Sequence, residues 1–251
     1  MNPTLSIVIP SYNEGKNILH VFRAFALLNV AYSSTHPFEL IFVDNGSTDL
    51  SHDVIADLLK DPVYHFISVV HVPRNIGYGH GIMSGLRQAK GEYLCWTHGD
   101  LQTPPGDCFK AFDLLLTSGD PERTVVKGRR TGRPWGEWFF TFGMSVISTL
   151  VLGRVLFDVN AQPKVFHRSF LSLMVSAPDD FSLDLYWLYT AKKKGYTLSL
   201  LPVYFRQRMH GVSRWAFSLS SRLRTIWRTV RYIFHLRSLL TSDHALHHSS
   251  R

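Results

Sequence analysis

The sequence predicts an α/β fold in which a mostly parallel sheet is flanked by helices. Over the first hundred residues, short apolar runs suited to buried strands alternate with longer segments whose apolar residues recur at helical spacing. Clusters of polar residues follow the apolar runs, at the places where the strands would end. In sheets built from such units, ligands gather at the carboxyl ends of the strands. We therefore expect a Rossmann-like sheet that carries its functional groups at that edge.

The first half of the chain supplies four strands and three helices in alternation. The first strand, residues 5–10, is a β-branched run that ends at Pro10. The helix after it, residues 16–28, has its apolar residues on one side, namely Ile18, Val21, Phe22, Phe25 and Leu28. The other strands are expected at residues 39–43, 66–70 and 92–96, and the other helices at 51–59 and 79–89.

The second half is less regular. Helices are expected at residues 109–117, 137–152, 183–194 and 218–239, strands at 124–127 and 197–204, and a turn followed by a strand at 159–166. We expect one domain over residues 1–215, a basic amphipathic helix over 216–241 and a flexible tail over 242–251.

Composition narrows the class of protein. Of the 251 residues, 45% are hydrophobic and 13% aromatic, as in a packed globular domain, and the formal net charge is +8. This charge suits a nucleic acid, an anionic membrane surface or a phosphorylated substrate without distinguishing them. Cys95 and Cys108 are too few for a disulfide framework, and the N-terminus lacks the pattern of a secretory signal. The longest uncharged stretch, residues 138–153, is shorter than the ~20 residues of a spanning helix. We expect a cytoplasmic protein without a transmembrane helix.

The helix expected at the C-terminus has an apolar face and a basic face. Apolar residues that include Val230, Ile233 and Phe234 fall at helical spacing, whereas Arg228 and Arg231 lie on another face. Such a helix can rest on anionic lipid, or it can pack on the domain with its arginines exposed.

A candidate metal site follows the fourth strand. Asp100 and Gln102 offer oxygen ligands and His98 offers an imidazole nitrogen. Mg²⁺ accepts the oxygens, and Mn²⁺ accepts both kinds of ligand. An ion held here would bridge a diphosphate and neutralise the charge that develops as it leaves.

Several motifs occur in an order that resembles a known family. Pro10 to Glu14, Val43 to Asp49 and Asn75 to Gly79, followed by Asp100-Leu101-Gln102, resemble the family 2 glycosyltransferases of the GT-A fold. Gly128-Arg129 and Arg208 to Arg214 extend the likeness to the polyprenol-phosphate sugar transferases, the group that includes dolichol-phosphate mannosyltransferase. The resemblance covers residues 5–215 and implies a nucleoside diphosphate sugar donor, a divalent metal and a polyprenyl phosphate acceptor.

The resemblance assigns roles to residues on the donor side. Pro10, Tyr12 and Glu14 would border the base and ribose, and Asp44 would bind one of them. Asn75 and Gly77 belong to the same donor site, and Asp100 and Gln102 would hold the metal. Arg208, Ser213 and Arg214 match the segment that closes over the diphosphate, where guanidinium groups suit bidentate phosphate binding.

The sequence departs from the family at two positions. His98 stands where the family usually has an aspartate, which leaves direct coordination of the metal open. The helix expected at residues 137–152 contains no arginine, although the polyprenol-phosphate enzymes usually carry one there. An acceptor phosphate would then rely on Arg129, Arg130 or Arg133, with Gln162 also on the substrate side.

Asp179 and Asp180 precede the helix expected at residues 183–194. Either carboxylate could act as a general base towards a hydroxyl acceptor, or it could cap the helix. A lipid phosphate is already anionic and needs no strong base.

Three hypotheses about function follow. The first is an inverting, metal-dependent hexosyltransferase that uses a polyprenyl phosphate at the inner face of the membrane, with Asp100 and Arg208 in catalytic roles. The second is a transferase that glycosylates a hydroxyl of a glycan or glycolipid. The third is a non-catalytic module that binds a nucleotide sugar or a membrane. We expect peripheral membrane contact, Mg²⁺ or Mn²⁺ as cofactor and no nucleic-acid partner.

Overall fold

The computed structural model describes residues 3–131, 146–205 and 227–238. Within them, the strands are β1 (Leu5–Ser11), β2 (Phe38–Asp44), β3 (Ile67–His71), β4 (Tyr93–Trp96), β5 (Thr124–Thr131), β6 (Lys164–His167) and β7 (Thr197–Tyr204). The α-helices are α1 (Gly15–Tyr32), α2 (Ser51–Leu58), α3 (Tyr78–Gln88), α4 (Asp107–Leu116) and α6 (Leu183–Lys193). Residues 146–152 and 227–238 are also helical, and short 3-10 helices cover Pro62–Tyr64, Pro121–Arg123 and Arg168–Leu173.

The strands form one seven-stranded sheet in the order β3-β2-β1-β4-β6-β5-β7. The neighbours β1–β2, β2–β3, β1–β4 and β5–β7 pair in parallel, whereas β6 runs antiparallel to β4 and β5. The chain leaves β1 towards β2 on one side and later returns as β4 on the other. Such a reversal of strand order opens a crevice at the carboxyl ends of the strands, where α/β proteins bind their ligands.

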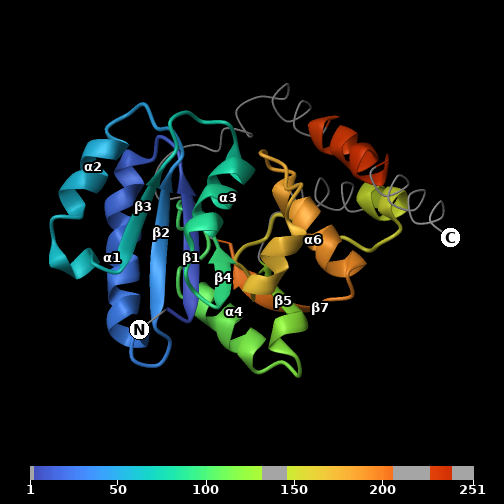
Figure 1. Cartoon of the computed structure of the whole chain (residues 1–251), viewed down its shortest axis with the longest axis horizontal. Helices are drawn as coiled ribbons and strands as arrows, with labels where there is room; N and C mark the ends of the chain where they lie inside the picture. Colours follow the sequence, from blue (N-terminus) through green and yellow to red (C-terminus); the bar gives the residue numbers. More distant parts are fainter. Residues whose placement is uncertain (1–2, 132–145, 206–226, 239–251) are drawn as a thin grey trace.

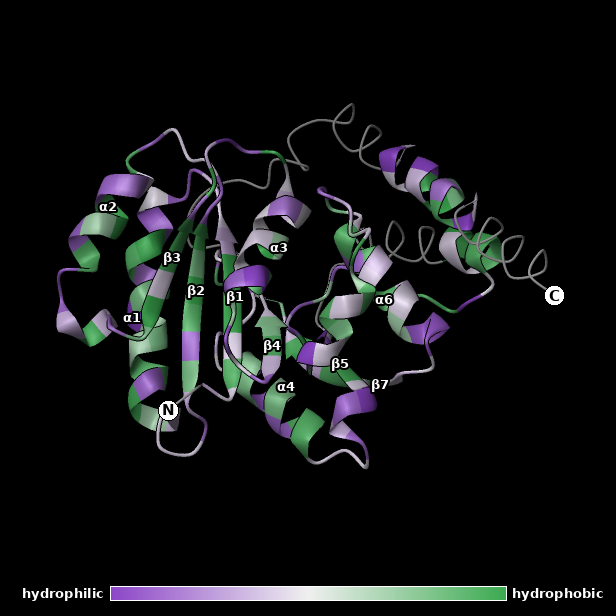
Figure 2. Ribbon diagram, viewed as in Figure 1, coloured by the Kyte–Doolittle hydropathy of each residue, from purple (hydrophilic) through white to green (hydrophobic). Residues whose placement is uncertain are grey.

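Helices cover both faces of the sheet (Figure 1). Ile7 and Ile9 of β1 point into an apolar cluster with α1, α2 and α4, whereas Val8 points into a second cluster with α3 and α6. Figure 2 shows apolar residues concentrated along the central strands, with polar residues on the outer turns. Burial on both faces explains why these strands are nearly continuous apolar runs.

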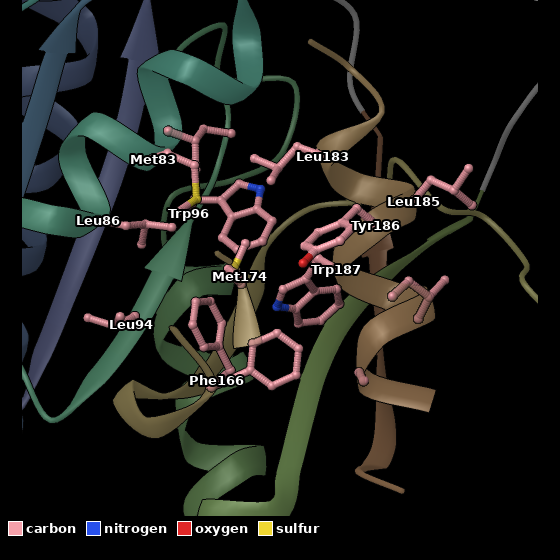
Figure 3. Close-up of a cluster of buried hydrophobic side chains, with 14 of the residues drawn as sticks. Met83, Leu86, Leu94, Trp96, Phe166, Met174, Leu183, Leu185, Tyr186 and Trp187 are labelled. Atoms are coloured by element: carbon pink, nitrogen blue, oxygen red, sulfur yellow. The ribbon is translucent and has the colours of Figure 1, made fainter. Parts of the chain in front are cut away.

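Aromatic side chains fill the space between α3 and α6. Trp96, at the end of β4, meets Trp187 edge-on with ring centroids 5.5 Å apart and meets Phe166 at 5.6 Å. Figure 3 shows Trp96, Met174 and Trp187 pointing towards one another from three segments. Because β4 ends inside this cluster, the segment that follows it starts from a rigid base.

The predicted fold class is confirmed, and the four strands of the first half begin and end within one residue of their predicted limits. α1 is four residues longer than predicted at its C-terminal end, where Tyr32 stacks on Phe109 of α4 at 4.4 Å. β5 also runs four residues further, because Gly128 to Thr131 pair with Leu201 to Tyr204 of β7.

The C-terminal helical residues 227–238 pack on the domain. Ile233 and Leu236 are buried in the cluster shared with α6, whereas Arg228 and Arg231 are exposed. Phe234, on the predicted apolar face, is 54% exposed, whereas its neighbour Ile233 faces the core. Residues 218–226 and the tail predicted for 242–251 lie outside the described residues. Within the described segments, no helix is long and apolar enough to span a membrane.

Candidate active site

The loops that follow β1 and β2 are tied together by hydrogen bonds. The backbone N–H of Asn13 donates to Ser47 Oγ at 3.0 Å, and the N–H of Thr48 donates to Asn13 Oδ1 at 2.8 Å. Asn13 sits in the left-handed region with φ of 55°, a conformation that asparagine tolerates well. The carboxylate of Glu14 accepts from the Asn17 side chain in the first turn of α1. Pro10 near the end of β1, and Tyr12 and Glu14 in the loop after it, therefore lie beside the end of β2.

Asp44 is the last residue of β2 and is buried at 5% exposure. Its Oδ1 accepts from the backbone N–H of Ser47 at 3.0 Å, and its Oδ2 lies 3.4 Å from Nδ1 of His71. The N–H of Asn45 donates to Ser11 O at 2.8 Å, which joins the ends of the two strands. These bonds hold the Asp44 carboxylate in place at the crevice.

The loop before α3 meets the loop before α6. Asn45 Nδ2 donates to Gly77 O at 2.9 Å, and the N–H of His80 donates to Asp179 O at 2.9 Å. A side-chain carbon at Gly77 would lie 2.3 Å from Asp179 O, and one at Gly79 would lie 2.1 Å from Pro178 O, so only glycine permits this approach. Asn75, in the same loop, is exposed.

The segment predicted to bind metal leaves β4 at the centre of the sheet. Asp100 is 8% exposed, and its Oδ1 accepts from the backbone N–H of Gln102 at 3.1 Å. Leu101 between them has φ of 56°, so the chain turns sharply here. Burial lowers the pKa of His98, against the opposing effect of Asp100. The imidazole is therefore neutral at pH 7 and is able to act as a metal ligand.

Several buried polar atoms at this edge lack partners. Within the described residues, five buried side-chain polar atoms have no hydrogen-bond partner. Four of them belong to Ser11, Asn45, Ser51 and Thr103, which stand in or beside the loops that follow β1, β2 and β4. Native proteins usually pair such groups with ordered water or a ligand.

A buried polar cluster lies beneath residues 98–102, the segment predicted to bind metal (called the metal segment below). Lys164 Nζ lies 2.7 Å from Asp184 Oδ1, with exposures of 0% and 1% for the two side chains. Burial lowers the pKa of Lys164, and Asp184 opposes this shift. The Gln162 amide oxygen accepts from Tyr78 Oη at 3.0 Å and from Lys164 Nζ at 3.2 Å. Burial also raises the pKa of Tyr78 well above its usual value, which keeps the phenol protonated as a donor.

The Tyr78 ring connects this cluster to the metal segment. It lies 5.8 Å from the His98 ring and stacks on Phe181 at 4.7 Å between centroids. Gln162, predicted on the substrate side, is thus linked through Tyr78 to the metal segment.

Of the three arginines predicted for the acceptor, the two within the described residues differ in their surroundings. Arg130 donates through Nε and Nη2 to Asp158 Oδ1, at 2.8 and 2.6 Å, and its backbone N–H donates to Oδ2 at 2.8 Å. Arg129 is exposed. Buried Lys127, on the same strand, donates to Gly128 O at 2.8 Å, and burial lowers its pKa to about 7.

Asp179 and Asp180 have separate environments. Asp179 Oδ1 lies 3.2 Å from His80 Nδ1, and its side chain is 64% exposed. Asp180 Oδ1 accepts from the backbone N–H of Ser182 at 2.9 Å, so this carboxylate caps the turn that leads into α6.

The structure links some of the residues that the sequence predicted. Asn45, which follows Asp44, donates to Gly77 O, and Tyr78 contacts the ring of His98 and donates to Gln162. Arg133, Arg208, Ser213 and Arg214 lie outside the described residues. The sequence reasoning missed the Lys164–Asp184 pair, although a lysine and an aspartate inside otherwise apolar elements were a signal for it.

Comparison with known proteins agrees with this geometry. The model of the family described as glycosyl transferase family 2 matches residues 6–172. The undecaprenyl-phosphate 4-deoxy-4-formamido-L-arabinose transferase of Enterobacter sp. (strain 638) is 26% identical over 220 residues, which cover 85% of this chain and 63% of that protein. The protein of that name from Yersinia enterocolitica is 36% identical over 127 residues, covering 50% of this chain and 38% of the relative. The chain thus spans less than two thirds of these relatives.

Solved structures share the fold. Glucosyl-3-phosphoglycerate synthase from Mycobacterium tuberculosis, in complex with Mn²⁺, UDP and glucosyl-3-phosphoglycerate, aligns with a TM-score of 0.68 at 20% identity, over 94% of this chain and 80% of that chain. The mannosyltransferase PcManGT from Pyrobaculum calidifontis, in complex with GDP-Man and Mn²⁺, aligns with a TM-score of 0.60 at 19% identity, over 86% and 60% of the two chains.

Proposed function

The chain belongs to glycosyltransferase family 2, and from this premise we propose that it is an inverting, metal-dependent enzyme that transfers a hexose from a nucleoside diphosphate sugar to a polyprenyl phosphate. The observation that carries the proposal is the family 2 match over residues 6–172, together with the oriented carboxylates of Asp44 and Asp100 at the carboxyl ends of β2 and β4. The names of the curated relatives support a polyprenyl phosphate as acceptor.

The donor would lie across the loops after β1 and β2. Pro10, Tyr12 and Glu14 would border the base and ribose, and Asp44, whose orientation is fixed by Ser47, would accept a hydrogen bond from one of them. Asn75 and Gly77 would complete this side. Because the loops are hydrogen-bonded to one another, the site is organised before the donor arrives, which reduces the entropy lost on binding.

Asp100 and Gln102, with the neutral imidazole of His98, offer a donor set that fits Mn²⁺, and the two oxygens alone fit Mg²⁺. When bound, the ion would neutralise charge on the leaving diphosphate. The Mn²⁺-containing neighbours of the same fold support this role. Arg208, Ser213 and Arg214 would hold the diphosphate from the other side.

On the acceptor side, the phosphate would attack the anomeric carbon directly while the diphosphate leaves from the opposite face. Because the nucleophile is already anionic, the protein has mainly to position it. Arg129 is exposed and would contact the phosphate, whereas Asp158 holds Arg130 in a fixed orientation beside it. Gln162 would face the substrates from the core side of the site.

A surface for contact with the membrane lies on the C-terminal side of the domain. The helical residues 227–238 expose Trp227 at 65% and Phe234 at 54%, together with Arg228 and Arg231. The helical residues 146–152 pack into the same apolar cluster and expose Leu150 at 77%. Apolar side chains beside exposed arginines suit an anionic lipid surface, such as the inner face of a membrane.

A hydroxyl acceptor is the second candidate. The guanidinium of Arg130 already donates to Asp158. Asp179 presents an exposed carboxylate, as a general base requires, and this carboxylate lies beside His80. A glycan or glycolipid hydroxyl would then take the place of the lipid phosphate.

One experiment distinguishes these acceptors. Candidate donors are first ranked by the thermal shift that they produce with Mn²⁺, since a bound ligand stabilises the folded state. The radiolabelled donor is then incubated with undecaprenyl phosphate or with a panel of saccharides. An acid-labile lipid product formed only from the polyprenyl phosphate supports the proposal, and a labelled saccharide supports the second candidate. Absence of both transfer and Mn²⁺-dependent donor hydrolysis would indicate a non-catalytic binding module.

A further inference from the structure

Three side chains that commonly bind transition metals gather beside the donor loops. Asp44, His52 and His71 each offer one ligand atom, and these atoms all lie within 4.8 Å of one another. The rings of His52 and His71 have centroids 4.8 Å apart at an interplanar angle of 55°. The cluster contains none of the residues of the Asp100–Gln102 segment.

The fold explains why three residues far apart in sequence meet. Asp44 and His71 are partners in the parallel register of β2 and β3, and both stand at the carboxyl ends of their strands. His52 lies in the first turn of α2, which begins seven residues after the end of β2. Two strand ends and a helix start thus bring one carboxylate and two imidazoles to a single corner of the sheet.

The Asp44 carboxylate is already oriented for such a role. Its Oδ1 accepts from the Ser47 backbone N–H at 3.0 Å, while its Oδ2 faces His71 Nδ1 at 3.4 Å. A carboxylate that is fixed through one oxygen is a well-positioned ligand through the other. The His71 side chain is 48% exposed, so its ring can rotate by the small amount that coordination requires.

We propose that Asp44, His52 and His71 form a binding site for Zn²⁺ or a related first-row divalent ion. Two imidazoles and one carboxylate are a ligand set that suits zinc, with water at the remaining position. Ligand atoms around a tetrahedral ion stand about 3.4 Å apart when each lies about 2.1 Å from the metal. The separation of Asp44 Oδ2 and His71 Nδ1 has this value already, so His52 has the larger adjustment to make. This site goes beyond the proposed function but shares Asp44 with the proposed donor site, so zinc bound there would compete with the base or ribose of the donor for that carboxylate. The zinc titration is therefore made without donor, and its outcome is separate from that of the transfer assay.

The test is a zinc titration in competition with a chromophoric chelator. The full chain carries His244→Ala, His247→Ala and His248→Ala, because these C-terminal imidazoles could also bind zinc. In this background, His52→Ala and His71→Ala are compared with His65→Ala, which removes an exposed histidine outside the cluster. Zinc held at His98 or elsewhere contributes to every variant alike.

We expect one zinc equivalent to weaken by more than about tenfold in both His52→Ala and His71→Ala and to stay unchanged in His65→Ala. Far-UV circular dichroism of each variant without zinc checks that the fold is retained. Equal zinc affinity in all folded variants would overturn the assignment.

Discussion

Lys164 Nζ and Asp184 Oδ1 lie 2.7 Å apart in the core, beneath the candidate active site, with both side chains closed off from solvent. The pair joins β6 to α6, two elements that also contribute to the aromatic cluster around Trp96 and Trp187. Breaking a buried ion pair leaves an uncompensated charge, which costs more than the intact pair contributes.

Asp184→Asn should therefore lower the free energy of unfolding by about 3–5 kcal/mol, measured by urea denaturation at pH 7. The double variant Lys164→Met with Asp184→Leu removes both charges and should recover most of that loss. If Asp184→Asn unfolds with the free energy of the unmodified protein, the pair does not hold β6 to α6 in the way described.

Lys127 gives a prediction about pH. Burial lowers its pKa from 10.5 to about 7 in the folded protein, with Asp158 opposing and Lys164 and Arg130 adding to the shift. Between about pH 7 and 10.5 the unfolded chain binds a proton that the folded chain does not, so this residue makes the free energy of unfolding rise with pH. The free energy of unfolding would rise by at most about 1.4 kcal/mol per pH unit through this residue.

Lys127→Met removes this titration. The variant should gain most stability over the unmodified protein at pH 7 and less at pH 9.5, as measured by urea denaturation at both values. A stability difference that is the same at the two pH values would show that Lys127 keeps its proton when buried.

His98 is the residue of the metal segment at which the chain departs from its family's usual aspartate. His98→Asp would replace a nitrogen ligand, which Mn²⁺ accepts, with an oxygen ligand, which Mg²⁺ prefers. We expect the ratio of the Mg²⁺-supported to the Mn²⁺-supported transfer rate to rise severalfold. An unchanged ratio in an active variant would place His98 outside the coordination sphere.

Contact with a membrane is tested by vesicle sedimentation. The double variant Trp227→Ser with Phe234→Ser should reduce binding to vesicles that contain anionic lipid by about tenfold or more, since two large apolar groups are lost. Val30→Ser is a matched control, because Val30 is 82% exposed on α1, at the far end of the sheet (Figure 1). If the unmodified protein, the double variant and Val30→Ser all bind the vesicles equally, the C-terminal helix does not contact the membrane.

The sequence predicted the elements whose signal is local. β1, β2 and β7 are apolar runs bounded by turn residues, and their limits follow closely from that pattern. α1 and β5 were predicted too short because their ends depend on partners, the Phe109 ring and the β7 strand, that only the folded chain provides. The order of strands in the sheet, with β6 antiparallel to β4 and β5, was not predicted, because it depends on pairing between segments far apart in the sequence.

The candidate site was predicted in part for the same reason. Residues in continuous motifs, such as Asp100 and Gln102, could be placed at a strand end from the sequence alone. Lys164 and Asp184 are 20 residues apart and pair through tertiary packing. Asp44 and His71 meet through the strand register of β2 and β3. A charged residue in an apolar element signals that it needs a partner, but no local pattern says which residue that partner is.

The proposed glycosyl transfer depends above all on Asp100, which follows the end of β4. The most direct measurement compares the rate of sugar transfer to undecaprenyl phosphate, with Mn²⁺ present, between the unmodified protein and Asp100→Ala. Asp57→Ala, which removes an exposed carboxylate on α2, serves as the control. We expect Asp100→Ala to lose more than about 100-fold in rate while Asp57→Ala keeps full activity. Full transfer activity in Asp100→Ala would contradict this expectation.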